Sequence, residues 1–319
     1  MHWFAETRED YCPRWFRAMA QTAPERWRTL EDQGPSAVLM KRVLTPERVA
    51  VIISGGGSNG PFIPGFVGEG LADAAVVGPP YAAPSAYALY EAGKALGSSK
   101  GILLLYNNFM GDYLNNDLAA ELLQLDGIHV EQAICADDMG MARGEPKENR
   151  GGRIGIAYPI RICAEAARQG ESLAEVTRLA RKAMSRLSTL SIVADPEQNR
   201  VTYGNGISGE PGFQTRENAG VADTAEETIR LLWEDVRPVQ GEQVCMMVNR
   251  MRMTSYSDSF VMAGCLYEAL IRRIPDVRMS VGGYQQVTDS YGYTVTLLCA
   301  DEELQRYLKG TLCGDGFLL

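Results

Sequence analysis

At 319 residues the chain is long enough for two domains of ordinary size, each with its own hydrophobic core. Its formal charge is −9, from 31 basic and 40 acidic residues, and neither sign forms a long run. This balance argues against a nucleic acid or an anionic membrane as partner. No segment approaches the about 18 apolar residues of a membrane span, and residues 1–10 lack the apolar core of a secretory signal. We therefore expect a cytoplasmic protein.

In the first half of the chain, short apolar runs alternate with helical patterns. Strands are predicted at residues 49–53, 74–77, 101–106 and 129–135. Apolar residues at helical spacing predict a helix over 118–125, and Ser172 with Glu175 forms a capping box for a helix through 187. This alternation is typical of a parallel or mixed sheet flanked by helices.

In the second half, the polar segment 196–200 predicts a break between domains. Beyond it we expect a strand at 243–248, a helix at 260–271, and a hairpin-like pair of strands at 277–282 and 293–298. The predicted fold is α/β, with two α/β domains over residues 1–195 and 196–319, each a mixed or parallel sheet flanked by helices.

The seven cysteines form no C-x-x-C pair, which favours reduced thiols. Cys135, Cys245 and Cys299 lie in apolar, strand-like runs and are expected in the core. The two histidines, His2 and His129, are far apart, so no metal site is expected.

A glycine-rich loop follows the first predicted strand and is the most informative local feature. Gly55, Gly57 and Gly60 match the dinucleotide pattern G-x-G-x-x-G, but Pro61 and Pro64 would interrupt the helix that this motif requires. A P-loop needs lysine where Pro61 stands. The loop is therefore predicted to bind neither NAD nor ATP, and to form the wall of a different site.

Residues 56–60 also match the nucleophile elbow G-x-S-x-G, with Ser58 as nucleophile. That triad needs a histidine base, and neither His2 nor His129 has a carboxylate with a clear claim to orient it. A purely structural turn is a further alternative for this loop.

Six ordered blocks along the chain resemble the K subunit of dihydroxyacetone kinases. They are Gly55-Gly56-Gly57-Ser58 with Gly65-Phe66-Val67-Gly68, Pro84-Ser85, Asn108-Phe109-Met110-Gly111-Asp112-Tyr113-Leu114-Asn115, Ala136-Asp137-Asp138-Met139, Arg150-Gly151-Gly152-Arg153-Ile154-Gly155, and Gly206-Ile207-Ser208-Gly209-Glu210-Pro211-Gly212. The resemblance implies a homodimer that binds a small ketose.

The chain departs from the family at its ionisable site positions. The family's histidine that holds the ketone covalently corresponds to Ser208, a second histidine after the glycine loop is absent, and a lysine is replaced by Asn107. A hydroxyl cannot form the hemiaminal, so the resemblance implies non-covalent binding here. Asp112 is the ionisable site group that remains.

The expected site combines Asp112 as the catalytic residue with substrate contacts from Gly56, Gly57, Ser58, Asn107 and Ser208. Asp112 follows the strand 102–106 at its carboxyl end, where α/β sheets bind ligands, and its carboxylate can accept a substrate hydroxyl proton. Alternatively it is a helix cap, although Asn115 and Asn116 are better placed before the helix expected at 118. Gly57 is expected to present its backbone N–H to the substrate, because only a residue without Cβ lets a ligand approach so closely. For Asn107, Ser208 and Gly57 the alternative is ordinary turn chemistry.

The function expected from this resemblance is the substrate-binding subunit of a kinase that phosphorylates a small ketose or polyol. No cofactor is expected on this chain, because ATP–Mg or ADP would be held by a separate nucleotide-binding subunit of the L type. Two alternatives stay open. One is a catalytically inactive, ligand-sensing paralogue, and the other is a different enzyme that uses Asp112 as acid or base on a ketone or lactone.

Overall fold

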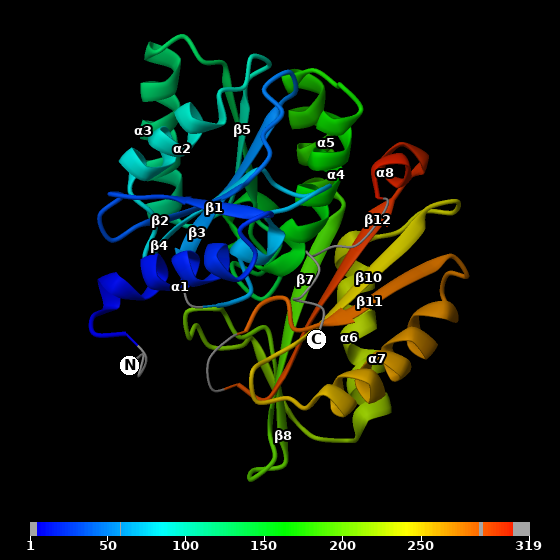
Figure 1. Ribbon diagram of the computed structural model, residues 1–319. Helices are drawn as coiled ribbons and strands as arrows, with labels where there is room; N and C mark the ends of the chain where they lie inside the picture. Colours follow the sequence, from blue (N-terminus) through cyan, green and yellow to red (C-terminus); the bar gives the residue numbers. More distant parts are fainter. Residues whose placement is uncertain (1–4, 58, 287–289, 309–319) are drawn as a thin grey trace.

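The computed structural model describes residues 5–57, 59–286 and 290–308 and contains two six-stranded mixed sheets, each flanked by helices (Figure 1). Long apolar runs form the central strands of both sheets. The predicted fold class is therefore confirmed.

The first sheet has the order β1-β2-β4-β3-β5-β6. Its strands are β1 (Trp27–Leu30), β2 (Ala37–Lys41), β3 (Ala50–Gly57), β4 (Ala74–Pro80), β5 (Ile102–Asn107) and β6 (Val130–Cys135). The last four are parallel to one another and coincide with the four predicted strands, whereas β1 and β2 form an unpredicted antiparallel edge. The chain runs from β3 to β4 on one side and then to β5 on the other. The carboxyl ends of β3 and β5 therefore form a topological switch point, where sheets of this type bind ligands.

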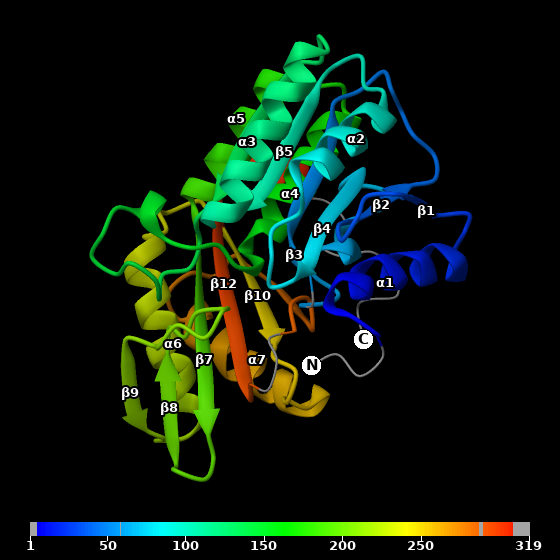
Figure 2. The ribbon, with the colours of Figure 1, turned by 90° about the vertical axis from the view of Figure 1, so that its left-hand side faces the viewer.

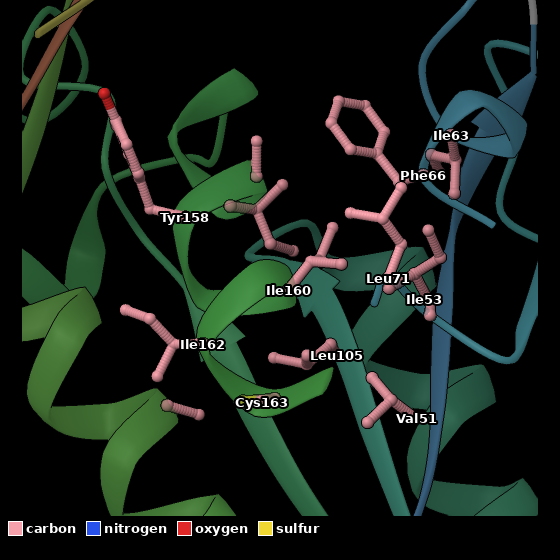
Figure 3. Packing of buried hydrophobic residues seen from close by; sticks show 14 of the residues in the cluster. Val51, Ile53, Ile63, Phe66, Leu71, Leu105, Tyr158, Ile160, Ile162 and Cys163 are labelled. Carbon is pink, nitrogen blue, oxygen red and sulfur yellow. The ribbon is translucent and has the colours of Figure 1, made fainter. Parts of the chain in front are cut away.

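Helices cover both faces of the first sheet. On one face lie α2 (Ala86–Leu96) and α3 (Met110–Leu125), and on the other α1 (Arg8–Thr22), α4 (Ala157–Arg168) and α5 (Leu173–Ser185). Figure 3 shows side chains of α4, including Tyr158, Ile160 and Ile162, beside those of the strands. The Ser172 hydroxyl accepts a hydrogen bond from the Glu175 N–H, as the predicted capping box requires.

The second sheet has the order β11-β10-β12-β7-β8-β9. Its strands are β7 (Leu187–Asp195), β8 (Arg200–Tyr203), β9 (Gln214–Glu217), β10 (Gln243–Arg250), β11 (Val277–Gly282) and β12 (Gly292–Ala300). Helices α6 (Val221–Val236) and α7 (Tyr256–Ile271) pack on its outer face (Figure 2). Its inner face packs against α4 and the short α8 (Glu302–Tyr307), so α4 is buried between the two sheets.

Several predicted boundaries differ from the structure. Strand β7 occupies residues at the end of the predicted first domain but pairs with β12 and β8, so the change of sheet falls before Leu187, and segment 196–200 is a hairpin turn. The helix expected to run through 187 ends at Ser185, because Leu187 is already the first residue of β7. The predicted hairpin was wrong, since β11 and β12 each pair with β10 instead.

Two compositional predictions are also tested. Cys135, Cys245 and Cys299 are buried free thiols, as expected, whereas Cys313 lies outside the described residues. None of the helices in the described ranges combines the length and apolarity needed to cross a bilayer.

Candidate functional site

A cavity of about 240 Å³ lies at the carboxyl ends of β3 and β5, against a loop of the second sheet. Five predicted site residues line it: Gly56, Gly57, Asn107, Asp112 and Ser208. The sixth, Ser58, lies outside the described residues. The described lining also includes Ser54, Gly55, Asn59, Phe62, Tyr81, Ala82, Ala83, Phe109, Gly111 and Ile207. Residues as far apart in the sequence as Ser54 and Ser208 therefore meet in one space.

The glycine loop is the last part of β3, where pairing with β4 is irregular between Gly55 and Gly57. A Cβ on Gly57 would lie 2.2 Å from the Cys12 sulfur and 2.8 Å from the Gly78 carbonyl oxygen. We predicted that Gly57 lacks a side chain so that a ligand can approach. The structure gives a different reason, because the space a side chain would need is filled by helix α1 and strand β4. After the loop, Pro64 opens only a short 3₁₀ turn.

Asp112 lies in the first turn of α3 and is almost fully buried, at 5 % exposure. Burial raises the pKa of its carboxyl from 3.8 to about 7. A helix N-terminus favours a carboxylate by about 0.3–1 kcal/mol, which is less than one pKa unit, so desolvation outweighs it. A carboxyl with a pKa near 7 is suited to general acid or base catalysis at neutral pH.

The capping alternative for this segment is wrong. Helix α3 begins at Met110 rather than 118, its N-cap is Phe109, and no side chain caps it. Asn115 and Asn116 therefore lie inside the helix. The early start was missed because Gly111 and the polar residues 115–117 interrupt the apolar period.

Two asparagines instead attach the start of α3 to its surroundings. The Ser54 hydroxyl donates to Asn116 Oδ1 at 3.1 Å, and Asn116 Nδ2 donates to the Asp112 carbonyl at 2.8 Å. Asn115 Nδ2 donates to the Pro84 carbonyl at 2.7 Å. These bonds hold the turn that carries Asp112 against the end of β3.

Asn107 is the last residue of β5 and is buried. Its Nδ2 donates to the Arg153 carbonyl at 3.2 Å, while its Oδ1 has no partner among the described residues. Asn59, which also lines the cavity, has a buried Oδ1 that likewise lacks a partner among the described residues. Buried amide oxygens are usually paired, and a ligand hydroxyl would satisfy such an acceptor.

Ser208 comes from the loop between β8 and β9 and is exposed. Its N–H donates to Glu210 Oε2 at 2.9 Å, and the Gly206 N–H donates to the Glu210 carbonyl at 2.9 Å. The loop is therefore ordered locally, and the Ser208 hydroxyl lies where a ligand in the cavity can contact it.

A buried ion pair attaches this loop to the first domain. Arg153 Nε donates to Asp138 Oδ2, and Arg153 Nη2 donates to the Asn205 carbonyl, which also accepts from the Ser191 hydroxyl at 2.6 Å. Asp137 accepts from the Arg153 N–H at 2.6 Å. The blocks around Asp138 and Arg153 thus position the Ser208 loop and do not line the cavity.

Five further lining residues were not predicted from the sequence: Asn59, Phe62, Tyr81, Phe109 and Ile207. Phe109 and Ile207 lie inside recognised motifs, and Asn59, Phe62 and Tyr81 lie within a few residues of one, so proximity in sequence was the available signal. Tyr81 has a left-handed backbone, with φ of 59°, directly after two prolines. This turn brings it to the mouth of the cavity.

Asp112 is the one charged side chain among the described lining residues, which include no lysine, arginine or histidine. Nor does the described part of the chain contain a group of three His, Cys, Asp or Glu residues placed to hold a metal ion. The cavity offers a carboxylate that can accept a proton at neutral pH, together with amide oxygens and backbone groups. These groups suit a polyhydroxylated ligand.

Comparison with known proteins identifies the family. The Dak1 domain model matches residues 17–312. The chain belongs to the Dak1 family. It is 30% identical over 291 residues to the dihydroxyacetone-binding subunit of a PTS-dependent dihydroxyacetone kinase of Listeria innocua, covering 87% of both chains. It is 29% identical to the corresponding subunit of Lactococcus lactis, covering 86% of this chain and 87% of that one.

Longer relatives contain this region as a part. A D-erythrulose kinase of Mycolicibacterium smegmatis is 30% identical over 288 residues, which cover 86% of this Dak1 chain and 50% of the kinase. The fold agrees with the crystal structure of the C. freundii dihydroxyacetone kinase in complex with AMP-PNP and Mg²⁺, with a TM-score of 0.87, 24% identity, and coverage of 98% of this chain and 60% of that one.

Proposed function

We propose that this Dak1 chain is the substrate-binding subunit of a phosphotransferase that acts on a small ketose or polyol. The observation that carries the proposal is the single cavity where the glycine loop, Asn107, Asp112 and Ser208 meet. The relatives named as dihydroxyacetone-binding subunits and erythrulose kinases support the choice of substrate class.

In this proposal Asp112 accepts the proton of the substrate hydroxyl that attacks the phosphoryl group. Transfer of a phosphoryl group depends mainly on positioning and charge stabilisation, with a base to orient the nucleophile. Asn107, Ser208 and backbone groups of the glycine loop hold the remaining hydroxyls. Binding is non-covalent, because Ser208 stands where the family resemblance places the histidine that forms the hemiaminal.

The phosphoryl donor comes from a separate nucleotide-binding subunit of the L type, which carries ATP–Mg or ADP. The surface beside the cavity mouth supports such docking, since Tyr81, Met110 and Leu114 are exposed apolar side chains there. We further propose a cytoplasmic homodimer. Exposed Tyr256, Phe260 and the other apolar residues on the outer side of α7 are suited to a subunit contact.

The test is reconstitution. The chain is combined with the L-type subunit of its own organism and ATP–Mg, and dihydroxyacetone, erythrulose and glycerol are supplied in turn. We expect a phosphorylated product only when both subunits are present. Turnover by the chain alone, or a clear thermal shift of the chain with ATP, would contradict the division of labour between two subunits.

A second function is favoured by one observation, the absence of lysine and histidine from the described cavity lining. A Dak1 chain of this kind can act as a ligand sensor that binds a polyol without transferring phosphate. Saturable binding of a polyol with no turnover in the reconstituted system would favour the sensor.

A further inference from the structure

Asp112 differs from the other buried carboxylates in the described part of the chain. Each of the others accepts hydrogen bonds from a cation or from backbone N–H groups: Asp73 from Lys41, Asp138 from Arg153, Glu165 from Arg168, Glu242 from Arg186, and Asp137 from the N–H groups of Arg153 and Gly155. This is the usual condition of a buried charge. In the described part of the chain, every buried carboxylate outside the cavity therefore has a hydrogen-bond partner within the protein.

Asp112 has no cation within ion-pair distance among the described residues, and its Oδ1 has no hydrogen-bond partner there. Burial by itself accounts for the raised pKa of its carboxyl, with no nearby cation to offset it. Asp112 is also the buried acid that lines the cavity. The described residues therefore leave this carboxyl open to a partner supplied by a ligand.

The rest of the cavity does not supply a compensating charge. The described lining is made of glycine, alanine, serine, asparagine and aromatic or aliphatic residues, without lysine, arginine or histidine. Among the described lining residues, the charge in this small, partly enclosed space is therefore that of a single carboxylate. In such surroundings Coulomb interactions are stronger than in water.

We propose that this cavity selects its ligand by charge, so that an amine-bearing polyol binds more tightly than the neutral polyol and a carboxylated or phosphorylated one is excluded. The inference rests on the proposed function and narrows its substrate class. A ligand ammonium group would supply the counter-charge that Asp112 lacks, as a charge-assisted hydrogen bond. An anionic group would place a second negative charge beside the carboxylate.

The same charge has a consequence for the proposed reaction. The product of phosphoryl transfer to a polyol is a phosphate ester, which carries negative charge. Asp112 holds the hydroxyl proton directly after transfer. Once this proton has passed to solvent, the Asp112 carboxylate repels the phosphate ester and favours its release, because no described cation lines the cavity. The cavity is thus suited to bind the substrate before phosphoryl transfer and to release the phosphorylated product afterwards.

The test uses three compounds with the same three-carbon skeleton: 2-amino-1,3-propanediol, glycerol and glycerate. Their dissociation constants for the full chain are measured by calorimetry at about pH 8, where the Asp112 carboxyl, with its pKa of about 7, is mostly ionised. We expect the amine to bind about tenfold or more tightly than glycerol, and glycerate about tenfold or more weakly, the usual range for a charged hydrogen bond.

Variants assign the effect to one carboxylate. Asp112→Asn removes the charge at nearly constant size and should bring the three constants within several-fold of one another. Asp112→Ser is a second variant, should the first not fold. Glu121→Gln changes the net charge equally on the exposed side of the same helix and should keep the wild-type order.

Three outcomes would overturn the inference: equal constants for the wild-type chain, failure of the amine to bind, or the wild-type order persisting in both Asp112 variants. Each of these outcomes can be distinguished from a failure of the proposed function. Equal binding of the three compounds leaves a polyol site in place, whereas the expected order without turnover in the reconstituted system leaves charge selection and removes the kinase.

Discussion

The cavity and the domain junction beside it, formed by Asp137, Asp138 and Arg153, both contain buried polar groups. They differ in whether a buried carboxylate has a partner within the protein. At the junction, Asp138 pairs with Arg153, and Asp137 accepts backbone N–H groups. In the cavity, Asp112 has no counter-charge among the described residues and the oxygens of Asn107 and Asn59 lack partners. Paired groups hold the two domains together, and unpaired groups are free to meet a ligand. The comparison teaches that a buried carboxylate paired with a cation or with backbone N–H groups has a structural role here, whereas one without such a partner marks the candidate site.

The largest expected effect tests the junction. Arg153→Met leaves the Asp138 carboxylate buried without its partner, and breaking a buried pair costs about 3–5 kcal/mol. We expect the free energy of unfolding, measured by urea titration, to fall by that amount. The side chains of the pair are 1% and 0% exposed.

The matched control is Arg178→Met. Arg178 pairs with Glu175 and Glu303 at the surface, where an ion pair contributes about 0–1 kcal/mol. If the two variants lost equal stability, the junction pair would not be the structural element that we describe.

The second prediction concerns the free energy of unfolding of the unliganded protein, which the ionised, buried Asp112 lowers. Its pKa of about 7 lies above the 3.8 of an unperturbed carboxyl, so the native state binds more protons than the unfolded state between these values. Stability therefore falls as the pH rises from about 4 to 7. Asp112→Asn removes this loss, and the variant should exceed wild type by up to about 4 kcal/mol above pH 7.

The measurement is urea unfolding of both proteins at several pH values. The difference should be near zero at about pH 4 and should grow through pH 7, since the other groups contribute equally to both proteins. Glu121→Gln removes one negative charge on the exposed side of the same helix and is the control for the change in net charge. A gain that does not vary with pH would have a cause other than the ionisation of Asp112.

The third prediction concerns catalysis. If Asp112 is the base of the proposed reaction, Asp112→Asn should lower turnover by about 100-fold or more and change the affinity for a neutral polyol by only several-fold. The assay requires the L-type subunit. A sensor would show a change in affinity and no turnover in either protein, while unchanged binding and unchanged turnover would remove Asp112 from the site.

The smallest expected effect is the absence of a covalent adduct, which is measured as an unchanged mass of the intact protein. Because Ser208 cannot form a hemiaminal, intact-protein spectrometry of the chain with dihydroxyacetone, with and without borohydride trapping, should show no added mass. Peptide mapping is the control for incidental modification of surface lysines. A stable adduct near Ser208 would mean that its block is aligned wrongly with the family.

Local sequence was sufficient for the features whose cause is local. Apolar runs predicted β3, β5 and β10, because a buried strand needs only a short continuous apolar segment. The Ser172 cap was predicted because its bond spans three residues. The motifs around the glycine loop and Asp112 are local as well, and they indicated which segments line the candidate site.

Non-local features were missed. The sequence of β7 is equally compatible with the end of the first domain, and only its pairing with β12 and β8 assigns it to the second sheet. The strands β11 and β12 seemed a hairpin from their order along the chain, yet β10 lies between them. Strand pairing of this kind depends on the whole sheet and not on a local pattern.

By itself, the sequence determined the α/β class, the main strands, the glycine loop and the residue types available to a site. Only the tertiary structure decided that Asp112 is buried without a counter-charge while Asp138 has Arg153, and that Gly57 is small to accommodate Cys12. Burial and pairing are properties of the packed molecule, because they depend on which distant segments approach each side chain. The sequence specifies which residues carry a carboxyl group, but the pKa of each carboxyl group is set by those neighbours.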